Sequence, residues 1–165
     1  MKSLSTDCLL IDYLANHPQH IATLAQWQQN QWHDISPQLN IDKRIEFMST
    51  HKNTAAVPVT LIALNNGQLM GSASLIENDM EDRPQYSPWL ASVFVAPAFR
   101  MQGIASALIT AIIQQAEALE LDQVYLFTPD ESEFYLRRGW KMVEHRHYHG
   151  VMVDIMIYRL NNKQN

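Results

Sequence analysis

The sequence predicts a mixed α/β fold, in which helices cover both faces of a central sheet. Segments with the alternating or continuous apolar pattern of strands are interspersed with segments whose apolar residues recur every three or four positions, as on one face of a helix. Their order is a strand, two helices, three strands, a helix, a strand, a helix and two strands. This order fits neither a doubly wound parallel sheet nor a barrel.

The N-terminal part predicts one strand followed by two helices. Residues 7–15 carry a short apolar run that fits a strand. Asn16 is suited to cap a helix, and Pro18 is tolerated in the first turn of that helix. The apolar face of this helix is formed by Ile21, Leu24, Ala25 and Trp32. A second short helix is expected from Asn40 to about Thr50, after a break at Pro37.

A β-hairpin and a loop follow. Residues 58–64 and 68–76 have the composition of strands. Asn66 and Gly67 between them both tolerate positive φ, which makes Asn-Gly a strong hairpin signal. Residues 77–88 are polar and acidic and contain two prolines, so we expect an exposed loop there.

A buried strand and a long helix come next. Residues 89–96 are almost all apolar, which predicts a strand that is buried on both faces and ended by Pro97. A helix is expected from Gly103 to Leu121, because apolar residues recur along one side of it. These residues are Ile104, Leu108, Ile112, Ala116 and Leu119.

The C-terminal part predicts a strand, a short helix and two further strands. Residues 124–128 read as a short buried strand. Residues 131–138 fit a helix that is closed by Gly139, because glycine is the usual residue just beyond a helix C-terminus. Residues 140–149 and 151–160 are expected to close the sheet as a pair of strands.

Length and charge point to one domain that does not bind nucleic acid. A chain of 165 residues and 19.0 kDa fits a single domain over residues 1–165. We expect a structured core from about residue 8 to 160 and a frayed tail at 161–165. The formal charge of −5 argues against a nucleic-acid partner, which would require a basic face on the protein.

Cysteine usage and apolar runs favour a cytoplasmic protein. Cys8 is the only cysteine, so an internal disulfide is impossible, and a small buried thiol is the favoured role. The first residues lack the pattern of a signal peptide. The densest apolar stretch, residues 89–99, is far shorter than the roughly 20 residues that cross a bilayer. We therefore expect no membrane association.

The segment from Val93 to Leu108 carries the clearest functional signal. A buried strand ends there, a loop turns between Arg100 and Gly103, and a long helix begins at once. Such a junction directs backbone N–H groups and the positive end of the helix dipole toward one spot. Gly103 lets a ligand approach the backbone closely, and Arg100 is available as a counter-charge. The pattern favours a pyrophosphate site, although an ordinary turn in which Gly103 eases packing has the same spacing.

Two motifs in this half of the chain match one family pattern. Arg100, Gly103 and Ala105 fit the sequence Arg/Gln-x-x-Gly-x-Gly/Ala, and residues 134–140 fit Phe-Tyr-x-x-x-Gly-Phe/Trp. Both motifs resemble those of the GNAT superfamily of N-acetyltransferases, and the resemblance in element order extends over about residues 8–160. It implies a mixed, mostly antiparallel sheet with a splayed pair of strands that forms a cleft for coenzyme A.

The resemblance implies that acetyl-CoA is the co-substrate and that no metal is needed. The pantetheine arm would hydrogen-bond the backbone around Val93 and Val95, the pyrophosphate would sit on N–H groups at the start of the long helix, and the strand that contains Thr128 would diverge from its neighbour. The residues expected to bind the cofactor are Val93, Phe94, Val95, Arg100, Met101, Gln102, Gly103, Ile104, Ala105, Ser106 and Thr128. Met101 and Ala105 depart from the commonest residues of the motif, but neither departure removes a backbone N–H.

The implied reaction is transfer of an acetyl group to a primary amine of a small molecule or peptide, by direct attack in a ternary complex. Tyr135 is the expected acid for the departing thiolate, because a phenol stays protonated at pH 7; the alternative is a core aromatic whose hydroxyl caps a carbonyl. The strand at residues 89–93 lacks the Glu that many relatives use as a base. The base is left open among Glu77, Asp79, Glu81, Asp82, His145 and His147.

Other readings of the sequence are retained beside this one. A catalytically silent CoA-binding sensor or interaction module would use the same fold, and a longer acyl donor or an alcohol acceptor is also compatible with it. A homodimer is common among relatives, although no feature of the sequence demands one. His145, His147 and His149 alternate along one strand, but exposed histidines are a better account of them than metal ligands. Packing is the better account of Trp89 and Trp140, which flank the expected cleft.

Overall fold

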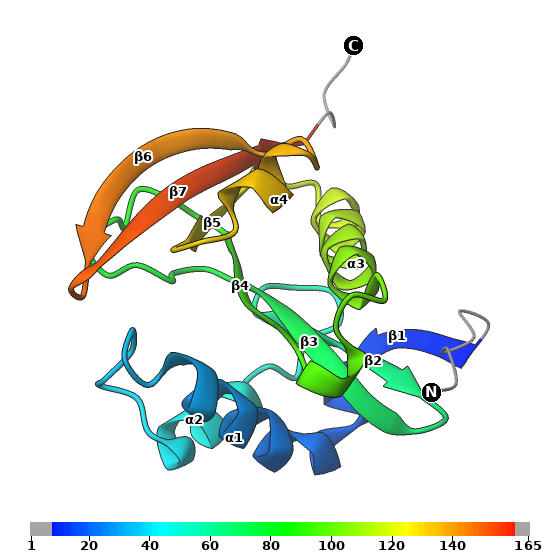
Figure 1. The fold of residues 1–165 in the computed structure, drawn as a ribbon. Helices are drawn as coiled ribbons and strands as arrows, with labels where there is room; N and C mark the ends of the chain where they lie inside the picture. Colours follow the sequence, from blue (N-terminus) through cyan, green and yellow to red (C-terminus); the bar gives the residue numbers. More distant parts are fainter. Residues whose placement is uncertain (1–7, 161–165) are drawn as a thin grey trace.

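The computed structural model describes residues 8–160 of the chain, and the expected tail at 161–165 lies outside the described residues. Seven strands form one sheet in the order β1-β2-β3-β4-β5-β7-β6 (Figure 1). The strands are β1 (Leu9–Tyr13), β2 (Val59–Asn65), β3 (Gln68–Ile76), β4 (Trp89–Val95), β5 (Gln123–Thr128), β6 (Lys141–Tyr148) and β7 (Val151–Arg159). The helices are α1 (Ile21–Trp32), α2 (Ile41–Ser49), α3 (Ile104–Ala118) and α4 (Ser132–Leu136).

Strand pairing confirms the mixed, mostly antiparallel sheet. All neighbouring strands run antiparallel except β4 and β5, which are parallel. Trp89 on β4 pairs with Tyr125 on β5, and the Tyr125 N–H donates to the Pro88 carbonyl at 2.9 Å. The register between the two strands ends with that pair, so β4 and β5 separate beyond it. This is the splayed pair that the resemblance to the GNAT superfamily implies.

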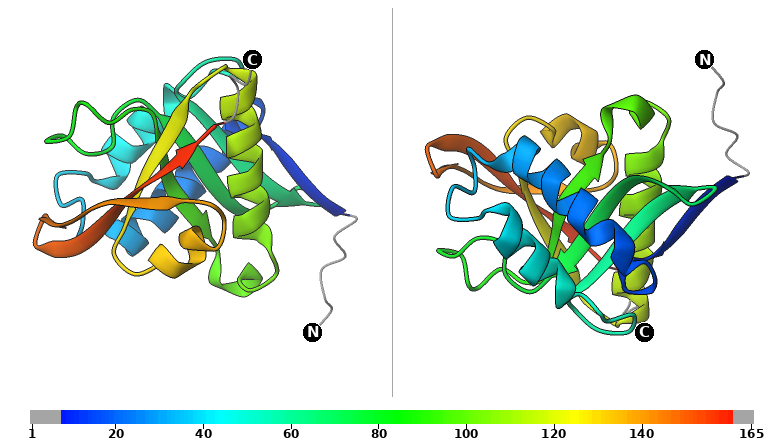
Figure 2. Two further views of the ribbon diagram at one scale, coloured as in Figure 1. Left: turned by 90° about the horizontal axis from the view of Figure 1, so that it is seen from above. Right: turned by 90° about the horizontal axis from the view of Figure 1, so that it is seen from below.

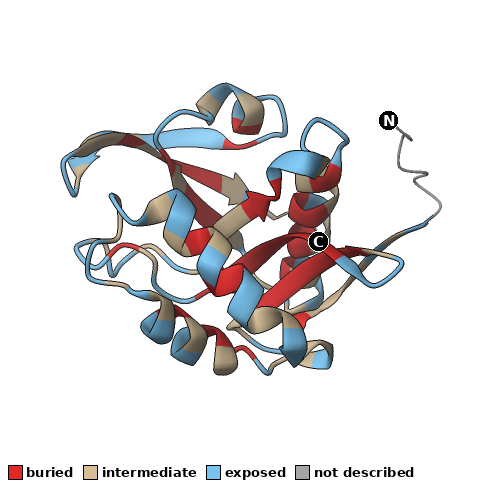
Figure 3. Cartoon of the chain, turned by 60° about the horizontal axis from the view of Figure 1, so that its bottom comes forward, coloured by how far each residue is buried: buried red, intermediate tan, exposed pale blue. Residues whose placement is uncertain are grey.

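The two faces of the sheet bury separate clusters of side chains, as the alternation of a strand requires. On β2, Leu61 and Ala63 pack in the cluster that contains α3, whereas Ile62 and Leu64 pack in the cluster that contains α1 and α2. Seen from above, α3 lies in front of the sheet, and seen from below α1 and α2 lie in front (Figure 2). The buried residues concentrate on the central strands between these helices (Figure 3). Helices on both faces are therefore confirmed.

Local signals fix the hairpin and the second helix. Asn66 and Gly67 have φ of 49° and 80° and join β2 to β3, as the Asn-Gly pair predicts. The Asn40 side chain accepts a hydrogen bond from the Lys43 N–H at 2.8 Å and caps α2. Gly139, with φ of 91°, follows the end of α4.

The first helix begins later than expected. Residues 18–20 form a 3-10 turn, and the α-helix starts at Ile21. Asn16 does not cap it, because the Asn16 amide donates to Asp12 Oδ1 at 3.1 Å and His17 Nε2 lies 2.8 Å from Asp12 Oδ2. The strand expected over 7–15 is correspondingly shorter, and residue 7 lies outside the described residues.

A bulge bends β4 close to the point where it leaves β5. Ser72 and Ser74 on β3 face Phe94 and Ala91 on β4, so β4 has one extra residue between these pairs. Ser92 lies in this bulge with φ of 56°. A bulge kinks a strand and disrupts its ladder, and it therefore turns the second half of β4 away from β5.

Candidate active site

One cavity of about 870 Å³ runs along the separated strands. Its lining comes from α1 and the segment that links it to α2, α2 itself, the end of β3, β4, the first turn of α3, the end of β5, and α4. Eleven of the twelve site residues expected from the sequence lie in this lining, and Gln102 lies outside it. Those in the lining are Val93, Phe94, Val95, Arg100, Met101, Gly103, Ile104, Ala105, Ser106, Thr128 and Tyr135.

The first turn of α3 presents an open backbone surface. Gly103 precedes the helix with φ of 80°, and a Cβ built on it would meet no atom within 4 Å. Met101, with φ of 62°, turns its side chain fully into solvent. The first N–H groups of a helix have no partner within the helix, and they attract an anion together with the helix dipole. The space in front of Gly103 therefore fits a phosphate that approaches these N–H groups.

Arg100 is held against the strand that precedes the helix. Its Nε donates to the Val95 carbonyl at 2.8 Å, and its guanidinium lies 5.6 Å from the centre of the Phe94 ring. The Phe94 ring packs against Trp27 and Trp32 of α1, with ring centres 5.5 and 6.0 Å apart. Arg100 is exposed otherwise, so its charge remains available beside the first turn of α3.

A second arginine reaches the same turn, and the sequence reading passed over it. Arg138 Nη2 and Nε donate to Ser106 Oγ at 2.8 and 3.2 Å, and its guanidinium stacks 3.5 Å from the centre of the Phe134 ring. Both Arg138 and Phe134 line the cavity. Arg138 stands inside the matched segment 134–140, so that motif was the signal for it. The first turn of α3 is thus flanked by two cations.

Thr128 marks the end of β5 and has a local structural role. Its Oγ1 accepts from the N–H groups of Glu131 and Asp130 at 3.0 and 3.4 Å. These bonds fix the turn into α4, which carries Tyr135. Thr128 therefore shapes the wall of the cavity, and its side chain is already engaged.

Tyr135 is buried at the base of the cleft. Its ring packs edge-on against Phe134 and Trp140, with ring centres 5.2 and 5.7 Å apart, and it lines the cavity. Burial, with a smaller contribution from Glu131, raises the pKa of its phenol to about 12, and Arg138 acts in the opposite direction. Among the described residues the hydroxyl has no hydrogen-bond partner. A protonated donor therefore faces the cavity.

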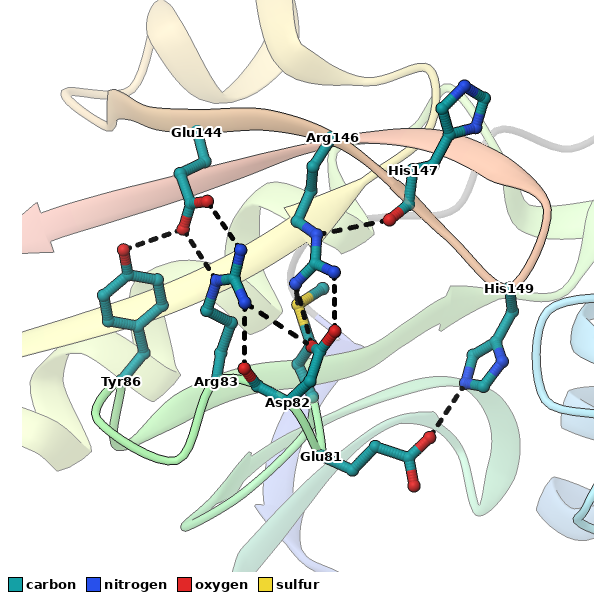
Figure 4. A network of polar contacts seen from close by, with 9 residues as sticks. Glu81, Asp82, Arg83, Tyr86, Glu144, Arg146, His147 and His149 are labelled. Carbon is teal, nitrogen blue, oxygen red and sulfur yellow. Dashed lines mark hydrogen bonds and ion pairs between the residues drawn. The ribbon is translucent and has the colours of Figure 1, made fainter.

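The acidic loop at 77–88 is exposed at most of its positions, as expected, but several of its side chains are paired with β6. Arg83 makes a two-pronged bond to Glu144 at 2.9 and 2.8 Å, and Tyr86 Oη donates to the same carboxylate at 2.8 Å (Figure 4). Asp82 receives two hydrogen bonds from Arg146 at 2.8 and 2.6 Å. These pairs hold the pKa of Glu144 at about 2, chiefly through Arg83, and lower the pKa of Asp82.

These pairs bear on the choice of base. Glu81 is paired with His149 at 3.3 Å and Asp82 with Arg146 (Figure 4). His145 is bonded to Asp154 across the β6–β7 hairpin. Of the six candidates, only Asp79 lies in the lining of the cavity; the others are Glu77, Glu81, Asp82, His145 and His147.

Asp79 stands in a different environment from its neighbours in the loop. It is half-buried between Ile76 at the end of β3 and the fully buried Met80. Among residues 8–160 no hydrogen bond to its carboxylate is present, and burial raises its pKa to about 7. A carboxyl group that titrates near neutral pH therefore borders the cavity.

The three histidines near the C-terminus do not converge. His149 lies in the β6–β7 turn with φ of 49° and points with Arg146 toward the acidic loop, whereas His147 points to the other side (Figure 4). All three histidines are exposed, as expected. Asp154, which also accepts a bond from Ser132, is a carboxylate beside His145 that the spacing did not reveal. Within residues 8–160 no three His, Cys, Asp or Glu side chains are grouped as metal ligands would be.

Two further expectations have opposite outcomes. Cys8 is exposed, so the expected buried thiol was wrong; it lies just ahead of β1, before the strand enters the sheet. Packing is confirmed for Trp89 and Trp140, which are 0% and 2% exposed.

Across residues 8–160 none of the helices combines the length and apolar character that crossing a bilayer requires.

Comparison with known proteins agrees with this geometry. The chain matches the family model described as acetyltransferase (GNAT) family over residues 21–140. No curated protein matches it by sequence. An aminoglycoside 6'-N-acetyltransferase complexed with coenzyme A has a TM-score of 0.74 at 15% identity, over 94% of this chain and 99% of that one.

Two further solved structures have the same fold. The yncA protein of Salmonella typhimurium, solved with its cofactor acetyl-CoA, has a TM-score of 0.72 at 14% identity, over 95% of this chain and 96% of that one. A spermidine N-acetyltransferase chimera from Vibrio cholerae and hSSAT has a TM-score of 0.66 at 20% identity, over 92% and 95% of the two chains. The family model covers well over half of the chain. The chain belongs to the acetyltransferase (GNAT) family and is an acyltransferase.

Proposed function

We propose that the protein is an acetyl-CoA-dependent N-acetyltransferase that acts on a primary amine of a small molecule. One observation carries the proposal: the open backbone surface at Gly103 and the buried phenol of Tyr135 border one continuous cavity along the separated strands β4 and β5. The first feature suits a phosphate and the second suits a leaving sulfur. Neighbours named for aminoglycosides and spermidine support a small-molecule amine as acceptor.

Cofactor binding is assigned to the first turn of α3 and its two cations. The N–H groups from Met101 to Ser106 would receive the pyrophosphate, with Arg100 and Arg138 as counter-charges. The bulged segment of β4 at Ser92 and Val93 leaves backbone groups outside the ladder, and these suit the amides of a pantetheine arm. When bound, acetyl-CoA supplies an acetyl group activated as a thioester.

The chemistry assigned to the protein concerns protons and charge. Only a neutral amine attacks a thioester, and an alkylamine with a pKa near 10.4 is about 0.04% neutral at pH 7. A base that accepts the amine proton therefore raises the rate. As the C–N bond forms and the C–S bond breaks, Tyr135 would donate its proton to the sulfur, which leaves as a thiol.

The alternative is a CoA-binding sensor without turnover, and one experiment separates the two. The protein is mixed with acetyl-CoA and a panel of primary amines, and released thiol is measured. Steady thiol release that depends on the amine supports the enzyme. Tight binding of acetyl-CoA without thiol release for any amine would favour the sensor.

A further inference from the structure

The cavity contains a buried arginine with no counter-charge. Arg44 on α2 is only 5% exposed and lines the cavity together with Trp32, Phe47 and Gln28. Its Nε donates to Gln29 Oε1 at 3.0 Å, and its Nη2 is buried without any hydrogen-bond partner. Among residues 8–160 no carboxylate pairs with it.

This placement destabilises the protein by itself. Removing a charge from water without a counter-charge is unfavourable, and burial accordingly lowers the pKa of Arg44. Arg44 also lies in the first turns of α2, where the helix dipole disfavours a cation. An anion that enters the cavity and pairs with Arg44 would offset both penalties.

The anion is not the diphosphate of coenzyme A, because the proposed diphosphate site lies at another part of the cavity. The first turn of α3 belongs to the side of the sheet covered by α3, with Ile104 in the cluster there and Arg138 bonded to Ser106. Arg44 belongs to α2, which packs on the opposite face with α1 (Figure 1). A ligand group at Arg44 therefore belongs to the second substrate, the acceptor.

We propose that Arg44 binds a carboxylate of the acceptor, so that the substrate is an amine that also carries a carboxylate, such as a free amino acid or a short peptide. This inference rests on the proposed N-acetyltransferase function and names the class of its acceptor. The planar guanidinium suits a carboxylate, which it can bind with two parallel hydrogen bonds. Trp32 and Phe47 provide an apolar wall for the carbon chain between the two charged groups.

The test compares acids with their amides. The standard amino acids and their carboxamides are titrated into CoA-saturated protein by calorimetry, and the same pairs are assayed for thiol release with acetyl-CoA. Amidation lowers the amine pKa, so chemistry alone favours the amides as acceptors. We expect binding and turnover of one or more acids to exceed those of the matching amide by about 10- to 100-fold.

Variants connect this preference to Arg44. In R44M the preference for the acid should disappear while the KM for acetyl-CoA stays the same; R44K should retain part of it. R44M should fold at least as stably as the native protein, because it removes an unpaired buried charge. The control is R159M, because Arg159 is exposed and lies outside the cavity. Four results would each overturn the proposal. The protein could bind no acid, bind acid and amide equally, or bind O-phosphoethanolamine more strongly than every acid. The fourth result is a raised KM for acetyl-CoA in R44M. Calorimetry measures the preference for the acid even if no amine is acetylated. In that case only the proposed N-acetyltransferase function would be contradicted.

A second inference rests on a separate observation, the position of Asp79. We infer that Asp79 is the general base and takes the amine proton, directly or through one water. It alone among the six candidate bases borders the cavity, and no described residue occupies its carboxylate. In the reaction the amine nitrogen bonds to the acetyl carbon as the C–S bond breaks, the nitrogen loses a proton to Asp79, and the sulfur gains one from Tyr135.

The test is the pH dependence of D79N. The titratable group that faces Asp79 from the neighbouring strand is Tyr148 on β6, and Glu81 and Asp82 flank it in the loop. Since the pKa of Asp79 is about 7, kcat/KM of the native enzyme should rise through that pH as the carboxylate forms. D79N should lower kcat by about 10²-fold or more and remove this rise, without changing the KM for acetyl-CoA.

The control is E77Q, because Glu77 is exposed in the same loop and lies outside the cavity. E77Q should keep both the rate and the pH profile. A D79N enzyme that keeps native kcat, or that loses rate but still shows the rise near pH 7, would overturn the assignment of the base.

Discussion

Arg138 donates two hydrogen bonds to Ser106 Oγ, at 2.8 and 3.2 Å, and so connects α4 to the first turn of α3. The contact spans 32 residues of sequence and joins the two segments that carry the family motifs. Its guanidinium is fixed on its other side by the Phe134 ring and carbonyl. A cation is thereby held in place beside the N–H groups that the proposal assigns to a phosphate.

R138A should therefore weaken the binding of acetyl-CoA by about 10-fold, because a charge-assisted contact to phosphate is lost. The neighbouring Arg137 is largely exposed, pairs with Glu133 and lies outside the cavity. R137A is therefore the matched control and should bind acetyl-CoA as the native protein does. Equal affinity of R138A and native protein, measured by calorimetry, would remove Arg138 from the site.

Gly103 and Gly67 offer a matched pair, because both have φ of 80° and open space around them. Valine at either position should lower the free energy of unfolding by a similar amount, roughly 1–2 kcal/mol, because of backbone strain. Only G103V should also lose affinity for acetyl-CoA, since its side chain fills the space in front of the helix N-terminus. The two variants are compared by urea unfolding and by calorimetry, and an equal affinity in both would contradict the phosphate assignment.

Y135F should lower kcat by about 10²-fold and leave the Kd for acetyl-CoA unchanged, because only the proton donor is removed. Since burial raises the pKa of Tyr135 to about 12, the phenol stays protonated throughout the usual assay range. Activity should therefore show no alkaline loss due to this group below about pH 10. Y158F, which alters a tyrosine outside the cavity, is the control; a Y135F enzyme with native kcat would identify Tyr135 as a packing residue.

His51 makes folding sensitive to acid. It is 2% exposed, its Nδ1 lies 2.6 Å from Thr60 Oγ1, its Nε2 has no partner, and burial lowers its pKa to about 4. The unfolded chain binds this proton near pH 6.5, so stability should fall by up to roughly 3 kcal/mol as the pH drops from 6.5 to 4.

H51N should remove this part of the pH dependence, although it is less stable than the native protein at pH 7. Urea unfolding between pH 4 and 7 measures both properties. H33N, which changes an exposed histidine, should keep the native slope. If H51N keeps the native slope as well, the acid sensitivity arises elsewhere.

Sequence patterns that act over a few residues predicted most of the fold. The Asn66-Gly67 turn and the glycine that follows the short fourth helix, Gly139, depend on the conformations of those residues alone, and both were found. Asn16 failed as a cap because Asp12, four residues earlier, binds its side chain. That competition is also local, but the cap preference of Asn gave no sign of it.

The candidate site was predictable where it is made of backbone. Gly103 and its neighbours act through N–H groups and open space, which a short motif specifies. Arg44, Asp79 and Arg138 act through burial and through contacts with distant elements, and these depend on how α2, the acidic loop and α4 pack. A carboxylate in an acidic loop looks the same in sequence whether it is paired, as Asp82 is, or unpaired in a cavity, as Asp79 is.

The most direct test of the account is a crystal structure of the protein with coenzyme A. We expect the diphosphate on the N–H groups at the start of α3, between Arg100 and Arg138, and the sulfur between β4 and β5 within reach of the Tyr135 hydroxyl. Coenzyme A bound at another face, or a diphosphate that makes no contact with the first turn of α3, would contradict it.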